Sequence, residues 1–182
     1  MEDKDKQLLL ELAKEAIVTR FKNEEPDIND VLHLDKIQGA FVTLHKNKQL
    51  RGCIGFPEGV MPLYKTIIEA ARSAAFGDPR FPVVTKDEMR NIHIEISVLT
   101  VPKLIEVNDS EDYNREIKIG KDGLIIRSNG RSGLLLPQVA TENHFTVGQF
   151  LNCLCQKAGL SFSAWENLDN HIYKFQAEIF SE

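Results

Sequence analysis

One short segment of the chain combines a nucleophile, a cation and two glycines. Arg51, Gly52, Cys53, Ile54 and Gly55 follow one another in the sequence. The thiolate is the nucleophilic form of cysteine, and a neighbouring cation favours it. Side chains alternate along a strand, so Arg51, Cys53 and Gly55 are predicted to point to the same side. This spacing indicates a covalent site at Cys53, with Arg51 lowering the pKa of the thiol.

The two glycines fit that prediction, and a simpler interpretation stays open beside it. Glycine inside a strand weakens the strand, and it often marks a place where a ligand or another backbone approaches closely. We therefore place Gly52 and Gly55, with Arg51, among the substrate-binding residues. The alternative is that Cys53 is an inert packing residue, because free cysteine is among the most buried residue types.

Further candidates come from two other segments. His93 and Glu95 are two residues apart on a predicted strand, and they could act as a base and its orienting carboxylate. The alternative for them is an exposed polar face of an antiparallel sheet. Asp78 and Arg80 flank a proline, and an arginine oriented by a carboxylate can bind an anion through two hydrogen bonds. The alternative for this pair is a local ion pair that closes the loop.

The remaining cysteines and basic turn residues carry no expected chemistry. Cys153 and Cys155 are two residues apart on a predicted helix, about 200° of rotation, so their thiols diverge and a zinc site is not expected. Lys121, Arg127 and Arg131 lie in glycine-containing turns and match no phosphate-binding loop. We expect no metal and no cofactor.

Composition excludes several classes of protein. The chain has 182 residues, 42% of them hydrophobic and 27% charged, as in ordinary globular proteins. Its net charge of −5 argues against direct nucleic-acid binding, because no global positive field attracts phosphate. Three cysteines form no disulfide framework, and the charged N-terminus is followed by no long apolar segment. We expect a cytoplasmic protein with no membrane span.

The first half of the chain is predicted to place these residues on a hairpin, a strand and two helices. Residues 39–44 and 49–55 form the hairpin around a polar turn at 46–49. The strand is predicted over residues 91–100, with its isoleucines facing the core. Amphipathic helices are predicted over residues 5–22 and from Pro62 to Gly77.

The second half is predicted to be a meander followed by a helix and a strand. Short strands are expected at 117–119, 124–126 and 134–136, separated by the Asp-Gly and Asn-Gly turns at 122–123 and 129–130. A capping box at Thr146 opens a helix that ends at Gly159, and the last strand covers 171–180. The fold class is therefore α+β, with a mainly antiparallel sheet flanked by helices.

Five segments, in this order, resemble the AMMECR family. The resemblance covers residues 5–180 and implies a single domain over 1–182, built as an α+β fold with a smaller lobe and a cleft that carries Arg51 to Gly55. It departs from the family at His144–Phe145, where many relatives have an aromatic pair with tryptophan. The segments are Leu50–Gly55, Asp78–Pro82, Ile94–Leu99, Ile119–Leu124 and Gly133–Ala140.

The family has no established activity, so the resemblance leaves two functions open. Relatives are encoded beside, or fused to, Memo-type and radical S-adenosylmethionine proteins, which implies a shared pathway and possible partners. In the first hypothesis, Cys53 performs covalent transfer or hydrolysis, Glu95 or His93 moves protons, and Asp78, Arg80 and Gln138 position a small polar or anionic substrate. In the second, the protein is a non-catalytic adaptor that binds a small molecule or a protein, with a possible link to RNA or basic cellular machinery.

Overall fold

The chain divides into two compact units in this computed structural model, which describes residues 1–182. The first unit contains Met1–Leu99 and Glu178–Glu182, and the second contains Thr100–Ala177. Strand β7 (His171–Ser181) begins in the second unit, and its last residues belong to the first. Because each unit has its own hydrophobic core, we describe them separately.

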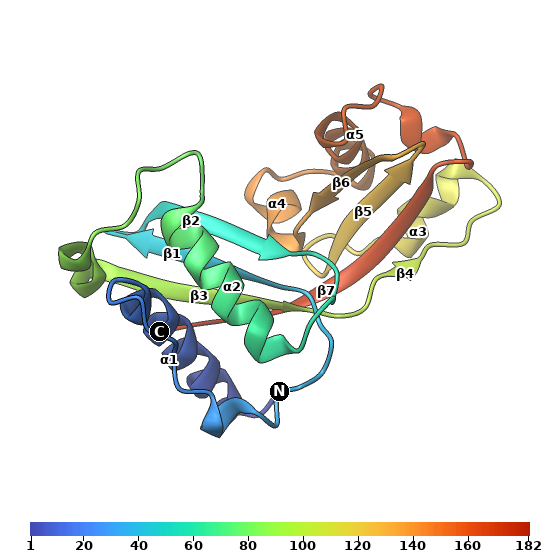
Figure 1. Cartoon of the computed structure of the whole chain (residues 1–182). Helices are drawn as coiled ribbons and strands as arrows, with labels where there is room; N and C mark the ends of the chain where they lie inside the picture. The colour runs from blue at the N-terminus through green and yellow to red at the C-terminus, as the bar shows by residue number, and fades with distance from the viewer. The chain divides into compact units, whose positions relative to one another are not determined.

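The first unit is a small antiparallel sheet with two helices on one face (Figure 1). Strands β1 (Ala40–Lys46), β2 (Gln49–Phe56) and β3 (Ile92–Leu99) are ordered β2-β1-β3. Helix α2 (Leu63–Phe76) packs on β1 and β2, and α1 (Asp3–Arg20) packs on α2 and β3. The short 3₁₀ helices η1 (Asn29–Val31) and η2 (Lys86–Asn91) lie in the connections. Strand β2 is therefore an edge strand, since only β1 pairs with it.

The alternating pattern of β3 is confirmed by its burial. Ile92, Ile94, Ile96 and Val98 are all buried, with the helices covering that face. Leu99 was expected on the opposite, polar face, yet it is only 1% exposed. The helices also lie where their apolar stripes predict them, within two residues at each end.

The hairpin of β1 and β2 contains a β-bulge within the segment predicted to hold the covalent site. Asn47 and Lys48 have φ of 52° and 63°, the left-handed conformation that a two-residue hairpin turn requires. The register places Leu44 opposite Gly52 but His45 opposite Leu50. Arg51 is thus an extra residue at a β-bulge, and such a residue is often aimed differently from its neighbours in the strand.

The two glycines beside Cys53 make room for parts of the protein itself. A Cβ at position 52 would lie 2.2 Å from the carbonyl oxygen of Ala74 on α2. A Cβ at position 55 would lie 2.4 Å from the carbonyl oxygen of Ala40 and 2.4 Å from the ring of Phe41. Of the two reasons expected for these glycines, a ligand or another backbone, the close approach of another backbone applies at both positions.

The second unit contains antiparallel strands and its own helices and core (Figure 1). Strand β7 pairs with β4 (Lys103–Leu104) and with β5 (Asp122–Ser128), which pairs with β6 (Arg131–Leu135). Helix α5 packs on β5 and β6. The helices are α3 (Tyr113–Glu116), α4 (Pro137–Glu142), α5 (Val147–Lys157), η3 (Ser110–Asp112) and η4 (Ala164–Glu166).

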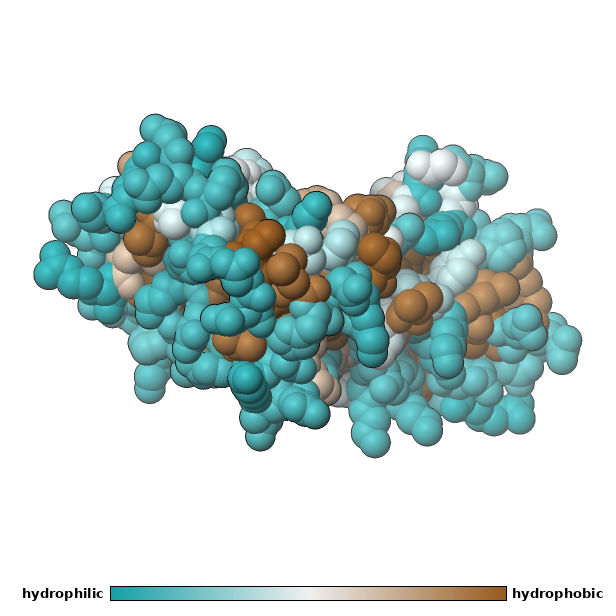
Figure 2. Space-filling view, turned by 60° about the horizontal axis from the view of Figure 1, so that its bottom comes forward, coloured by the Kyte–Doolittle hydropathy of each residue, from teal (hydrophilic) through white to brown (hydrophobic).

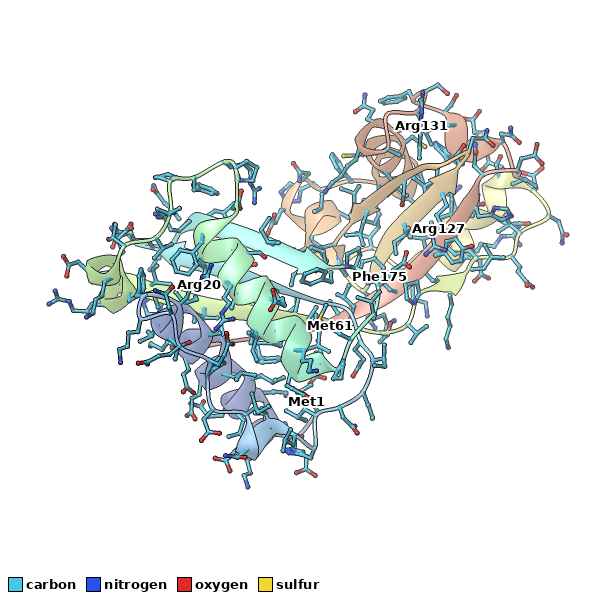
Figure 3. All side chains as sticks on the ribbon, in the orientation of Figure 1. Met1, Arg20, Met61, Arg127, Arg131 and Phe175 are labelled. Atoms are coloured by element: carbon cyan, nitrogen blue, oxygen red, sulfur yellow. The ribbon has the colours of Figure 1, made fainter.

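Two local predictions in this unit are wrong. Residues 117–119 form no strand, because α3 ends at Glu116 and a turn follows it. Asp122 and Gly123 are not a hairpin turn but the start of β5. Gly123 lies against the ring of Phe175 on β7, a residue labelled in Figure 3, and a Cβ there would be 2.4 Å from the ring.

Other predictions in the second unit are confirmed. Asn129 and Gly130 have φ of 45° and 77° and form the turn between β5 and β6. The Thr146–Gln149 capping box opens α5. Cys155 is fully buried, and burial raises the pKa of its thiol.

One face of the molecule is mostly hydrophilic (Figure 2). Figure 2 shows that smaller hydrophobic patches lie between the hydrophilic residues of this face. None of the helices combines the length and the apolar character that crossing a bilayer would need.

Replacing Gly52 by alanine should destabilise the first unit. The added methyl group would overlap the Ala74 carbonyl, so α2 must shift away from β2, at a cost of about 1–3 kcal/mol. Urea unfolding followed by far-UV circular dichroism measures this cost. The matched control is Gly148→Ala in α5, where no atom lies within 4 Å of the new methyl group. That change should be neutral or stabilising by less than about 1 kcal/mol. Equal stability of Gly52→Ala and wild type would contradict the packing argument.

Candidate functional site

Cys53 lies in the edge strand β2, with its side chain half-buried. Thr43 on β1 is directly opposite it, and the Thr43 hydroxyl donates a hydrogen bond to Sγ at 3.3 Å. The backbone N–H and C=O of Cys53 point away from β1, as the contacts below show. Thr43 and Cys53 are therefore a non-hydrogen-bonded pair, the type in which opposing side chains are closest. The sulfur thus has a fixed hydrogen-bond donor.

A row of three polar side chains crosses the sheet at this level. Thr43 is opposite Cys53 on one side and opposite Glu95 of β3 on the other. Residues paired in register share a face of the sheet. Neighbouring strands are about 4.8 Å apart, so the Cα atoms of Cys53 and Glu95 are separated by about 10 Å. Glu95 therefore does not hydrogen-bond the thiol directly.

The histidine predicted as a base lies further from the sulfur than Glu95 does. His93 is exposed and is opposite His45 of β1, two residues along β3 from Glu95. Glu95 is half-buried and forms no hydrogen bond or ion pair within the protein. The structure thus brings Glu95 and Cys53 onto one row, while His93 lies outside it.

The free edge of β2 is closed at Cys53 by two side chains. The Cys53 N–H donates to Oδ2 of Asp78 at 2.9 Å, and Nη2 of Arg80 donates to the Cys53 carbonyl oxygen at 3.1 Å. These are the two backbone groups that an adjacent strand would otherwise bind. The Asp78 side chain is 2% exposed, whereas that of Arg80 is 55% exposed.

Asp78 and Arg80 also bind each other through two hydrogen bonds. Nε of Arg80 donates to Oδ1 of Asp78 at 3.0 Å, and Nη2 donates to Oδ2 at 2.7 Å. The Arg80 guanidinium lowers the pKa of Asp78 well below its usual range, and the backbone N–H groups of Cys53 and Arg80 act in the same direction against the effect of burial. The loop-closing ion pair is present, and it also holds the backbone of Cys53.

The cation bound at Cys53 is Arg80, through the Cys53 carbonyl oxygen. Hydrogen bonds to Asp78 are the largest cause raising the pKa of Arg80, and the charge of Asp78 acts in the same direction. The role expected of Arg51 therefore differs in the structure. Its Nε and Nη2 each donate to an oxygen of Glu88 at 3.1 Å, so its charge is paired on η2.

Glu88 is the residue of this region that the sequence analysis did not single out. Besides Arg51, it accepts a hydrogen bond from Nζ of Lys46 at 2.8 Å and caps the N-terminus of η2 at Thr85. Arg51 first and Lys46 second hold the pKa of Glu88 well below its usual range. The Thr-x-x-Glu capping box over 85–88 was a usable signal, but it predicts a helix start and not the distant partners.

The remaining predicted site residues are distributed as follows. Gly52 and Gly55 flank Cys53 and lie against Ala74 and Phe41, as described above. Gln138 belongs to the second unit, in the first turn of α4, where its backbone carbonyl accepts a hydrogen bond from Thr141. The structure contains no cluster of three or more histidine, cysteine or acidic side chains able to hold a metal ion.

Chemically, this arrangement offers a thiol with one neutral donor and one cation beside it. Hydrogen bonds to the charged form of a group favour that form, as does a nearby opposite charge. The carboxylate of Glu95 is available on the same face for an exchange of protons with water or substrate. The Asp78–Arg80 pair holds the backbone in place and supplies the cation.

Replacing Asp78 by asparagine should destabilise the protein at neutral pH by about 2 kcal/mol, the scale of hydrogen bonds to a charged group. The pKa of Asp78 is depressed in the folded state, so its contribution is fully present above its unfolded pKa of about 3.9 and is lost as the pH falls below that value. Urea unfolding at several pH values should show the gap between wild type and Asp78→Asn closing in acid. The exposed pair of Asp87 and Arg90 provides the control, since Asp87→Asn should change stability very little. A gap that is independent of pH would contradict this assignment.

Comparison with known proteins identifies the family of this chain. The sequence profile of the AMMECR1 family matches residues 10–180. A protein of Methanococcus aeolicus is 50% identical over 149 residues, which are 81% of this chain and 75% of that protein. A protein of Methanothermobacter thermautotrophicus is 45% identical over 179 residues, 96% of this chain and 92% of the relative.

A solved structure agrees with these relatives. The crystal structure of the uncharacterised protein PH0010 from Pyrococcus horikoshii matches with a TM-score of 0.93 and 43% identity, covering 100% of this chain and 93% of that one. The relatives named here carry no activity in their names. The match over nearly the whole length shows that this chain belongs to the AMMECR1 family.

Proposed function

We propose that this AMMECR1-family protein is an enzyme that uses Cys53 as a nucleophile in covalent transfer or hydrolysis. The observation that carries the proposal is the pair of groups around Cys53. The Thr43 hydroxyl donates to Sγ at 3.3 Å, and the Arg80 guanidinium donates to the carbonyl oxygen of the same cysteine at 3.1 Å. A nearby cation favours the thiolate, which is the reactive form of cysteine.

The proposed reaction is an acyl transfer in two steps. The sulfur attacks an electrophilic carbonyl carbon, and a thioester bond forms as the bond to the leaving group breaks. The thiol gives up its proton to water as it attacks, and the leaving group departs with a proton from water, which Glu95 can relay. Water or a second acceptor then attacks the thioester, which releases the acyl product and returns the thiol.

The surroundings of Cys53 favour a small polar or anionic substrate. More than half of the Arg80 side chain is exposed while its inner face is held by Asp78, so the guanidinium can also meet an anionic group. Glu95 has no partner in the protein, and it lies about 10 Å from Cys53 in the row, measured between Cα atoms. A substrate that touches both residues must therefore lie across Thr43.

The first test measures the alkylation of individual cysteines by iodoacetamide at pH 7. Mass spectrometry should find Cys53 modified faster than half-buried Cys153, and fully buried Cys155 should not react in the folded protein. Thr43→Val keeps the shape of the side chain but removes the hydroxyl. It should slow the modification of Cys53 by up to about tenfold, equivalent to about 1.4 kcal/mol.

Cys153 serves as the internal control in that experiment, because Thr43→Val should leave its rate unchanged. In the next step, 4-nitrophenyl acetate serves as the acyl donor, and the site of acetylation is mapped in wild type and in Cys53→Ala. Acetylation concentrated on Cys53 and lost in the variant is the expected result. An unreactive Cys53, or acetyl groups spread over surface lysines in both proteins, would overturn the proposal and leave the non-catalytic adaptor as the better hypothesis.

A further inference from the structure

A cavity in the second unit lies beside a buried tyrosine. It has a volume of about 210 Å³ and lies between β4 with the residues after it, α3, and the start of β7. Ile105, Val107, Leu168 and Ile172 form its apolar walls, and Tyr113 and Asn170 supply polar atoms. The cavity belongs wholly to the second unit and is independent of the chemistry proposed at Cys53.

The hydroxyl of Tyr113 has no partner in the protein. The residue is 2% exposed, yet it forms no hydrogen bond, whereas a buried tyrosine hydroxyl usually finds a partner. The hydroxyl oxygen is not among the fully enclosed unpartnered atoms, so the small exposed part of the residue includes that oxygen. Tyr113 is also one of the residues that line the cavity. Burial raises the pKa of Tyr113, which keeps the hydroxyl neutral and able to donate.

Asn170 adds an acceptor to the same cavity. It is 9% exposed, and its side-chain NH₂ donates to the carbonyl oxygen of Ala164 at 2.7 Å. That bond fixes the amide and leaves its oxygen without a partner in the protein. A ligand hydroxyl could donate to this oxygen and accept from Tyr113.

Charge and size restrict the class of ligand. No lysine or arginine lines the cavity, so an anion finds no permanent counter-charge there; besides Tyr113, the ionisable side chains along it are those of Glu106 and His171. An apolar cavity of about 150 Å³ holds benzene, and this one is moderately larger. We propose that the cavity binds a small neutral molecule with one apolar ring and a hydroxyl group, which bonds to Tyr113 and Asn170.

Trp165 is a built-in reporter for this site. Its ring centroid is 6.2 Å from that of Tyr113, and its indole N–H donates to Asn152 at 2.7 Å. The chain has one tryptophan, so the indole N–H gives a single resonance in a ¹H–¹⁵N spectrum of the full-length protein. Phenol is the probe, and toluene is the matched probe without the hydroxyl. Phenol should shift the indole resonance saturably.

Tyr113→Phe tests the hydroxyl while keeping the ring on Trp165. It should weaken phenol binding about two- to tenfold, as expected for one hydrogen bond, and leave toluene binding unchanged. Tyr64→Phe in the first unit is the matched control and should change neither the phenol affinity nor the toluene affinity.

Leu104→Glu, at a wall position that is 42% exposed, should lower the affinity for both phenol and toluene without unfolding the chain. The proposal would be overturned if phenol caused no saturable shift of the wild-type indole resonance, because the cavity would then hold only water. An unchanged phenol affinity in Tyr113→Phe would also overturn it.

Discussion

The unpaired edge of β2 is the constraint on which the candidate site depends. An edge strand leaves backbone N–H and C=O groups without partners, and these two groups of Cys53 are bound by Asp78 and Arg80. The carboxylate is buried and charged, so it needs the guanidinium. The guanidinium held in this way is also the cation that the proposed chemistry at Cys53 uses. The structural and the chemical roles of Arg80 therefore cannot be separated by removing it, whereas Thr43 contacts the sulfur without closing the edge.

The site residues were predictable in kind, but their partners were not. Strand alternation predicts which residues of one strand share a face, but the row of Cys53, Thr43 and Glu95 also depends on the pairing register of β1 with β2 and β3, which the sequence does not show. Alternation fails for Arg51, because the bulge inserts an extra residue there and Glu88, 37 positions away, binds its guanidinium. The capping box at 85–88 is visible in the local sequence, but the bond between its Glu88 and Arg51 is a tertiary contact that the local sequence does not show.

The fold was predictable where a periodic pattern ran for several residues. Strand β3 and helix α5 each carry such a pattern, and α5 also has a capping signal at Thr146. The failures fall on short segments with a local signal that tertiary packing overrides. Asp122–Gly123 resembles a turn, yet Gly123 is in β5 because the Phe175 ring occupies the space of a side chain. Helices α3 and α4, of four and six residues, are too short to show a period.

The register of the sheet limits what the proposed chemistry can be. Glu95 is two strands from Cys53, about 10 Å between Cα atoms, so it cannot activate the thiol as the base of a close cysteine–base pair does. Activation in the ground state then depends on Thr43 and Arg80, and Glu95 can act only at the far end of a bound substrate or through water. An acyl group too short to span Thr43 would leave Glu95 unused. Loss of Glu95 should therefore matter for longer substrates and not for the alkylation of Cys53, which distinguishes this row from a compact catalytic triad.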